Sequence, residues 1–464
     1  MTEKNTAALR RLAPPDISLS GLAKLAGPIF IANLAVLGNV TIDTIMAGHL
    51  GAEDLAAVAL GGAATGSILM LLVGVIQGLS PICGHHFGAR RYERIGFEGC
   101  QALYIAAILS LVGIPMLAWT GFWNDLGQVT GRIAALTSTY LVFSAASIPF
   151  GLVNRIFISI NAAINRPRIT MWVSLVMLAL KAPVNAFFMY GLFGLPAMGG
   201  AGAGVSNAIL YAVSTVLFVA AFWRDPACRP MRPARLHAPD FRAIGEQLRI
   251  GLPIGLSVFF EVSSFTMMAI FISRLGAIAV SAHQIVSNIM ATLYMIPLSI
   301  GIASSVLVAQ SLGAGFPDFA ERMTRRALKV AITIALVMSG LLYCFNAAVI
   351  DVYTNVEAVR EMALVLITCG IVYHTFDAIQ AVGGFVLRGY KITWVPMLVS
   401  GVALWCFGLG AGYALCFTET PLGAPMGPIG FWIGCTAGLM LAAASLAGYA
   451  LMHARKVARV ATPA

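Results

Sequence analysis

The chain has 464 residues, of which 59% are apolar and only 10% are charged. A soluble domain carries about 25% charged residues, so this composition excludes an ordinary soluble protein and indicates a protein with many membrane-spanning helices. The net charge of +10 would suit nucleic-acid binding, but the basic residues lie in the connections between apolar segments, where membrane topology explains them better.

Twelve apolar segments are long enough to cross a bilayer at about 1.5 Å of rise per residue. Their approximate limits are 24–47, 55–83, 97–120, 136–160, 169–190, 202–223, 249–273, 279–309, 327–350, 361–387, 393–415 and 429–452. With twelve crossings, most of the 29 Lys and Arg residues fall on one side, which places both termini in the cytoplasm by the positive-inside rule. No apolar signal segment precedes the first span, so no cleaved signal peptide is expected.

The two halves of the chain align with each other without a gap over the first two helices of each half. Pro28-Ile29 aligns with Pro253-Ile254, and Leu50-Gly51-Ala52 aligns with Leu275-Gly276-Ala277. Each half holds six helices, an even number, so the halves are predicted to be parallel repeats with a site between them near the membrane midplane. The expected domains are an N-terminal bundle over 1–223, a solvated cytoplasmic Pro/Arg-rich linker over 224–247, and a C-terminal bundle over 248–464.

Ionisable residues inside membrane spans are expensive, so each one is a candidate functional residue. Three acids lie well inside predicted helices, Asp43, Glu261 and Asp377, and two bases accompany them, Arg155 and Lys181. The repeat aligns Asp43 with Met268, Glu261 with Val36 and Asp377 with Asn154. The C-terminal half therefore holds two buried carboxylates without a buried base, and the halves are predicted to differ in function.

Glu261 and Asp377 at similar depth predict a cation site. Two carboxylates in one dry cavity cannot both stay charged without a counter-cation, so the site is expected to take up H⁺ or Na⁺. Tyr373 and Gln380, one turn either side of Asp377, and Phe265, one turn after Glu261, would supply hydroxyl, amide and π-face contacts.

Structural alternatives remain open at this point. Either carboxylate of the C-terminal half could be neutral and merely hydrogen-bonded to a neighbouring helix, and Asp43 could form an ion pair with Arg155 or Lys181 that only holds the bundle together. An enzyme is not expected, because the sequence contains no metal-ligand motif such as H-E-x-x-H and no clear pairing of a nucleophile with a base.

Three stretches carry a resemblance to a known family: Asn39–Gly51 (NVTIDTIMAGHLG), Leu252–Phe265 (LPIGLSVFFEVSSF) and Phe376–Thr393 (FDAIQAVGGFVLRGYKIT). Together they resemble the NorM-like branch of the multidrug and toxic compound extrusion (MATE) family, over essentially the whole chain. The resemblance implies an all-α membrane protein with a V-shaped pair of six-helix bundles, which exports organic cations in exchange for inward H⁺ or Na⁺.

The resemblance also assigns roles to residues. It implies coupling-ion binding, with a possible Na⁺ site at the two carboxylates, by Glu261, Asp377 and Tyr373. It implies substrate binding by Asp43, Gln284, Tyr294 and Phe265. In one departure, the family usually carries Asn at the position of Lys181, and a lysine there leaves the role of Asp43 open.

The remaining expectations concern location and partners. We expect a multi-pass protein of the bacterial inner membrane that needs no cofactor beyond its coupling ion. It is expected to bind organic cationic drugs or dyes and membrane lipid, not nucleic acid, and to act as a monomer. The alternative function is a flippase of lipid-linked oligosaccharides from the same wider superfamily, which should line its cavity with several basic residues.

Overall fold

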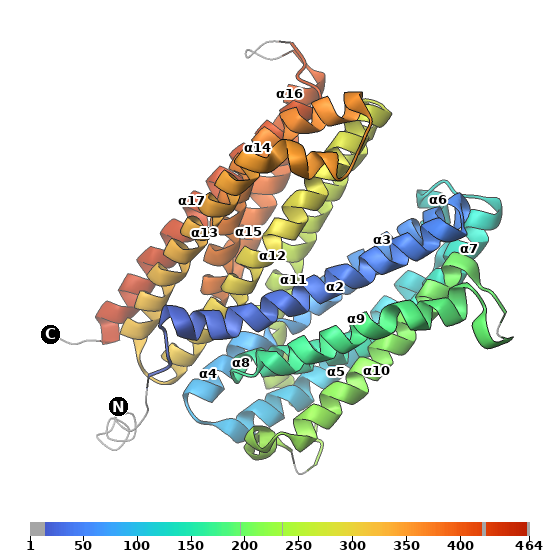
Figure 1. The fold of residues 1–464 in the computed structure, drawn as a ribbon. Helices are drawn as coiled ribbons and strands as arrows, with labels where there is room; N and C mark the ends of the chain where they lie inside the picture. The colour runs from blue at the N-terminus through green and yellow to red at the C-terminus, as the bar shows by residue number, and fades with distance from the viewer. Residues whose placement is uncertain (1–13, 195, 234, 420–423, 462–464) are drawn as a thin grey trace, which may run out of the picture. The chain divides into compact units, whose positions relative to one another are not determined.

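The computed structural model describes residues 14–194, 196–233, 235–419 and 424–461. The described residues form helices joined by short connections, with no strand among them (Figure 1). Eleven helices in this part of the chain are long and apolar enough to cross a membrane, and one bent pair makes up a twelfth span. The prediction of an all-α membrane protein with twelve spans is therefore confirmed.

The chain forms two compact units. The N-terminal unit is Gly27–Gly255, and the C-terminal unit is Leu256–Ala464 together with the residues up to Ala26. The repeat predicts a division in the linker, but both limits fall inside a helix. This is possible because the two ends of one continuous helix can pack in different units. Within the C-terminal unit, Nη1 of Arg326 donates a hydrogen bond to the carbonyl oxygen of Ile17.

The N-terminal unit is built from helices that follow one another closely along the chain. They are α2 (Leu19–Leu50), α3 (Ala52–Ile76), α4 (Leu79–Gly88), α5 (Tyr92–Ala118), α6 (Thr120–Leu126), α7 (Gly131–Ala145), α8 (Ile148–Ala163), α9 (Pro167–Met189), α10 (Gly202–Arg224) and the first half of α11 (Phe241–Ser273). The predicted fourth span is the bent pair, in which α7 and α8 meet at 46°. Pro149, in the first turn of α8, cannot donate a backbone hydrogen bond to the preceding turn, which explains the break.

The C-terminal unit is organised around one central helix. Its helices are the second half of α11, α12 (Ala277–Gly313), α13 (Pro317–Asp351), α14 (Glu357–Gly389), α15 (Trp394–Ser400), α16 (Gly410–Phe417) and α17 (Pro428–Ala461). Three long helices, α12, α13 and α17, all pack against α14. The eleventh predicted span is one helical stretch, Trp394–Phe417, whose middle part, Gly401–Leu409 between α15 and α16, is π-helical.

The backbone repeats the internal symmetry that the sequence predicts. Gly51, between α2 and α3, has a φ of 144°, and its counterpart Gly276, between α11 and α12, has a φ of 101°. Side chains disfavour such angles, so glycine is required at both turns. Farther along, Arg90 at 54° and its counterpart Gly315 at 81° also share a positive φ. The gapless alignment of the first two helices of each half is therefore matched by equivalent turns.

The linker between the halves is mostly exposed, as a solvated connection should be, but parts of it are docked on α5. The Gln101 side chain donates to the carbonyl of Ala238 at 3.1 Å and accepts from the backbone N–H of Asp240 at 2.8 Å. Cys228 in the turn Pro226–Met231 is completely buried. Gly96 of α5 allows this approach, since a Cβ there would lie 2.0 Å from the carbonyl oxygen of Met231.

Candidate coupling and substrate sites

Two helices of the C-terminal unit bring Glu261 and Gln380 into direct contact. Glu261 lies in α11, and Nε2 of Gln380 in α14 donates to its Oε1 at 2.8 Å. Asp377 lies one turn before Gln380, close enough to Glu261 for the two carboxylates to interact electrostatically. The structure thus brings together the two acids that the sequence places at similar depth, and it identifies Gln380 as the group that joins their helices.

Aromatic rings pack beside this pair of carboxylates. Tyr373, one turn before Asp377 and only 3% exposed, packs edge-to-face against Phe265 of α11 and against Trp432 of α17, each with centroids 5.6 Å apart. The ring of His283 lies 5.8 Å from that of Trp432. Tyr373 is therefore fixed in a rigid aromatic stack next to the carboxylates, while Phe265 remains partly exposed.

Helix α12 contributes a polar, exposed face to the C-terminal unit. Ser281, Gln284, Asn288 and Thr292 recur at helical spacing, and all four are exposed. A face of this kind is unsuited to lipid tails and is typical of the wall of a water-filled cavity. Tyr294, on the same helix, lies within electrostatic range of both Glu261 and Asp377.

Arg388 is the functional candidate of the C-terminal unit that sequence reasoning misread. A basic residue near the end of a span ordinarily marks the membrane surface, but Arg388 is buried, with its guanidinium 4.2 Å from the centre of the Phe385 ring. It also interacts electrostatically with Glu261. The available signal was spacing, because Asp377, Gln380 and Arg388 follow one face of the helix.

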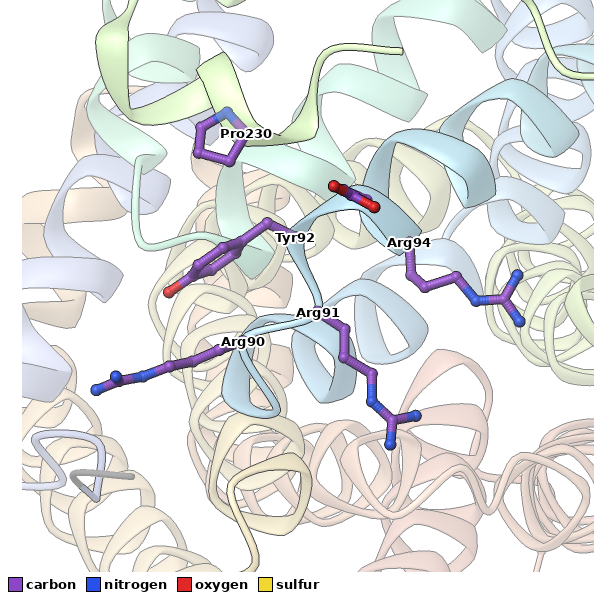
Figure 2. Close-up of a pocket in the computed structure, with 6 residues that line it drawn as sticks. Arg90, Arg91, Tyr92, Arg94 and Pro230 are labelled. Carbon is purple, nitrogen blue, oxygen red and sulfur yellow. The ribbon is translucent and has the colours of Figure 1, made fainter. Parts of the chain in front are cut away.

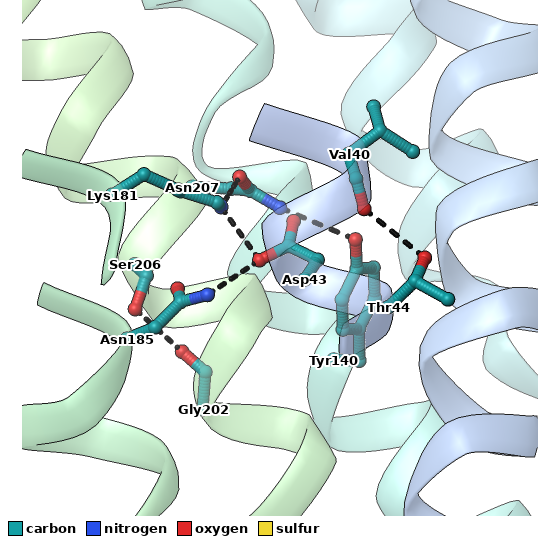
Figure 3. A network of polar contacts seen from close by, with 9 residues as sticks. All are labelled: Val40, Asp43, Thr44, Tyr140, Lys181, Asn185, Gly202, Ser206 and Asn207. Carbon is teal, nitrogen blue, oxygen red and sulfur yellow. Dashed lines mark hydrogen bonds and ion pairs between the residues drawn. The ribbon is translucent and has the colours of Figure 1, made fainter. Parts of the chain in front are cut away.

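A second polar cluster lies inside the N-terminal unit (Figure 3). Lys181 of α9 forms an ion pair with Asp43 of α2, Nζ to Oδ1 at 2.8 Å, and Nδ2 of Asn185 donates to the same oxygen at 2.7 Å. Nζ of Lys181 also donates to Oδ1 of Asn207 at 2.6 Å, and Nδ2 of Asn207 donates to the Tyr140 hydroxyl at 3.2 Å. We refer to these five residues as the Asp43 network.

The Asp43 network shows which basic residue pairs with Asp43. Of the two candidates that the sequence offered, Lys181 forms the ion pair, and its side chain is 1% exposed. An isolated charge at this depth would cost several kcal/mol, so each partner makes the other tolerable. Asn185, Asn207 and Tyr140 were missed by sequence reasoning, because amides and hydroxyls occur throughout membrane helices without marking a site.

The mirrored positions confirm that the two units differ at the carboxylate sites. Asn154, the counterpart of Asp377, donates to the Tyr211 carbonyl at 3.1 Å and accepts from Thr215 at 2.9 Å. It is therefore occupied in joining α8 to α10. Val36, the counterpart of Glu261, is 55% exposed. The N-terminal unit has no equivalent of the paired carboxylates among its described residues.

Two acids outside the candidate sites, Asp54 and Glu98, are also buried. Asp54 of α3 accepts from the backbone N–H of Gly200 at 2.6 Å and from Arg132 at 3.3 Å. Glu98 of α5 accepts from the amide of Gln247 at 2.7 Å. Because both acids join segments that are distant in sequence, we assign them a structural role.

The described surface also holds one shallow pocket, of about 400 Å³, at the turn between α4 and α5 (Figure 2). Arg90, Arg91 and Arg94 line it together with Pro230, and all three arginines are exposed. These are residues of the basic connections that the topology argument used.

No group of three or more His, Cys, Asp or Glu side chains in the described chain is arranged to hold a metal ion. A Na⁺ site at Glu261 and Asp377 would therefore depend on oxygen ligands from neutral groups as well.

A protein with twelve spans in two repeats, and with ionisable side chains held inside each half, has the organisation of a secondary transporter. The MatE family model matches residues 28–187 and 253–414, one segment in each half. The chain therefore belongs to the MATE family, which is a family of membrane transporters and not of enzymes.

Individual relatives support the same assignment. Two proteins named "Probable multidrug resistance protein NorM" are similar over almost the full length: that of Aromatoleum aromaticum is 37% identical over 93% of this chain, and that of Idiomarina loihiensis is 34% identical over 94%. Each alignment covers 94% of the relative. A structure described as "Outward-facing conformation of a multidrug resistance MATE family transporter of the MOP superfamily" matches the fold with a TM-score of 0.86 at 19% identity, over 99% of this chain and 100% of that chain.

Proposed function

We propose that the protein is a secondary active antiporter that exports organic cations, such as drugs and dyes, in exchange for inward H⁺ or Na⁺. The names of its relatives support multidrug efflux. The observation that carries ion coupling is the contact between Gln380 and Glu261, because it holds the helix that bears Asp377 against the helix that bears Glu261. The site residues for the ion would be Glu261, Asp377 and Tyr373.

The chemistry of this site suits a small hard cation. Carboxylate, amide and phenol oxygens are the ligands that Na⁺ prefers, and each carboxylate can also take up a proton. Without the ion, the two negative charges repel each other, and Arg388 offsets part of this repulsion. Loaded and unloaded forms therefore differ in free energy, and such a difference lets the ion favour one of two conformations in an alternating-access cycle.

The proposed substrate-binding residues are Asp43 in the N-terminal unit and Gln284, Tyr294 and Phe265 in the C-terminal unit. The exposed polar face of α12 supports Gln284 in this role, and the partly exposed Phe265 and Tyr294 rings offer π faces to a cation. The alternative function, export of lipid-linked oligosaccharides, needs basic side chains available to a pyrophosphate. The pairing of Lys181 with Asp43 counts against it, because that ammonium is already neutralised.

The remaining parts of the proposal concern setting. Relatives from bacteria support a multi-pass protein of the inner membrane. We further propose that both termini are cytoplasmic, that the protein works as a monomer in contact with lipid, and that it needs no nucleic acid and no cofactor besides the coupling ion.

Asp377→Asn tests the proposal, because it removes one negative charge with almost no change in shape. We expect this variant to lose dye accumulation in everted vesicles under imposed H⁺ and Na⁺ gradients, while its yield and gel-filtration profile stay normal. Whichever gradient drives efflux by the unmodified protein identifies the coupling ion. Glu361→Gln, at an exposed acid on the same helix, is the matched control. Normal efflux by the Asp377→Asn variant would contradict the proposal.

A further inference from the structure

The Asp43 network is electrically balanced before any substrate arrives. It contains one carboxylate and one ammonium, at 2.8 Å from each other, and Lys181 is fully buried. Both described contacts to the carboxylate reach the same oxygen, Oδ1, and the Asp43 side chain remains 10% exposed. A second cation could therefore approach Asp43, but it would meet a site that is already neutral.

The hydrogen bonds in the network fix the orientation of both amides. Asn207 must direct Oδ1 toward the ammonium, since its Nδ2 donates to Tyr140. Asn185 must direct Nδ2 toward Asp43, since a carboxylate only accepts. This leaves Oδ1 of Asn185 without a hydrogen-bond partner among the described residues, although Asn185 is fully buried.

The unsatisfied oxygen lies within reach of the ammonium. Lys181 and Asn185 are one turn apart on α9, so their side chains share one face of that helix. Nζ can therefore keep its hydrogen bond to Asn207 and replace its bond to Asp43 by a bond to Oδ1 of Asn185, with no loss of hydrogen bonds. The exchange leaves Asp43 unpaired, so it becomes favourable only when another cation takes the carboxylate.

We propose that Lys181 is a built-in competitor for Asp43, which an organic cation must displace toward Asn185 in order to bind. Lys181 then determines specificity: it weakens binding of cations at this site without affecting uncharged molecules of similar shape. The inference depends on the proposed export of organic cations only for its physiological meaning, because binding can be measured without transport.

The test is equilibrium binding to the purified full chain at constant pH. The probes are tetraphenylphosphonium, whose charge does not titrate, and triphenylphosphine oxide, which is uncharged. We expect Lys181→Asn and Lys181→Met to bind the phosphonium at least tenfold more tightly than the unmodified protein does. Their affinity for the phosphine oxide should stay within twofold of that of the unmodified protein. Lys181→Arg keeps the competing charge and should bind both probes as the unmodified protein does.

The double variant Asp43→Asn with Lys181→Asn links the effect to this pair. It should lose the gain in phosphonium affinity that Lys181→Asn alone produces. Equal or weaker phosphonium binding by the Lys181 variants, parallel changes for both probes, or a gain that persists in the double variant would each overturn the inference. If Lys181→Asn does not yield folded protein, Lys181→Gln, which keeps a donor toward Asp43, is subject to the same expectations. Failure of dye exchange in vesicles would instead contradict antiport and leave the binding result intact.

Discussion

At the scale of single residues, the C-terminal site depends on one neutral side chain. Gln380 supplies the described hydrogen bond to Glu261, at 2.8 Å. A hydrogen bond to a charged group contributes about 1.5–3 kcal/mol. The amide therefore stabilises the ion-free form of the site, which an antiporter must pass through each time the coupling ion is released.

Gln380→Leu should slow dye exchange about tenfold or more. The substitution keeps the size of the side chain but removes the donor to Glu261, so the ion-free form becomes rarer by the factor that corresponds to the lost bond. Initial rates of dye accumulation in everted vesicles measure the effect. Gln380→Asn, which shortens the side chain but keeps the amide, should give a rate between those of the unmodified protein and the leucine variant. An unchanged rate in the leucine variant would show that the contact does not influence coupling.

The sequence was sufficient to find the acids of both clusters, the base Lys181 and the neighbouring Gln380, and insufficient to find the neutral partners in the Asp43 network. Asp43, Glu261 and Asp377 stand out because charges inside spans are rare. Asn185, Asn207 and Tyr140 are of types common in any helix, and only the fold shows which of them face Asp43. Arg388 was misread for a related reason, since a basic residue near the end of a span ordinarily marks the membrane surface.

At the scale of elements, the docking of the linker can be tested through the reactivity of the Cys228 thiol. Burial raises the pKa of the Cys228 thiol above its ordinary value of 9.0, and the nearby Asp225 carboxylate acts in the same direction. At pH 8, below both values, Cys228 therefore has a smaller thiolate fraction than an ordinary cysteine, and it is also shielded from reagents.

We expect N-ethylmaleimide at pH 8 to leave Cys228 largely unmodified in the folded protein and to alkylate it once the protein is unfolded, as measured by mass spectrometry. Gln101→Ala removes both contacts that hold the linker near Ala238 and Asp240, and should raise the rate at Cys228 about tenfold. Equal rates at Cys228 in the folded and unfolded protein would rule out the docked linker.

Sequence patterns located the helices well and their interruptions poorly. Long apolar runs define spans because only a helix satisfies its backbone within a membrane. The π-helical segment Gly401–Leu409 lies inside a continuous apolar run, so composition gives no sign of it, and the bend between α7 and α8 is marked only by Pro149. The docking of the linker was equally hidden, because prolines and arginines suit a solvated segment and the contacts that hold it come from α5.

At the scale of the whole molecule, the distribution of basic residues makes a prediction about orientation. A green fluorescent protein fused to the C-terminus should fluoresce, and alkaline phosphatase fused there should be inactive, because we expect this end in the cytoplasm. Phosphatase fused after Gly276, in the turn between α11 and α12, should be active. Reversed activities at the two positions would contradict the proposed orientation.

The composition of the two units has a consequence for biosynthesis. Gly27–Gly255 is one continuous stretch, so the N-terminal unit can assemble as soon as α11 begins to emerge from the ribosome. The C-terminal unit cannot be completed in this way, because Ile17, which precedes the N-terminal unit in the chain, bonds to Arg326 near the start of α13. The leading segment must therefore wait through most of translation for its partner, and the C-terminal unit is the slower of the two to reach its final form.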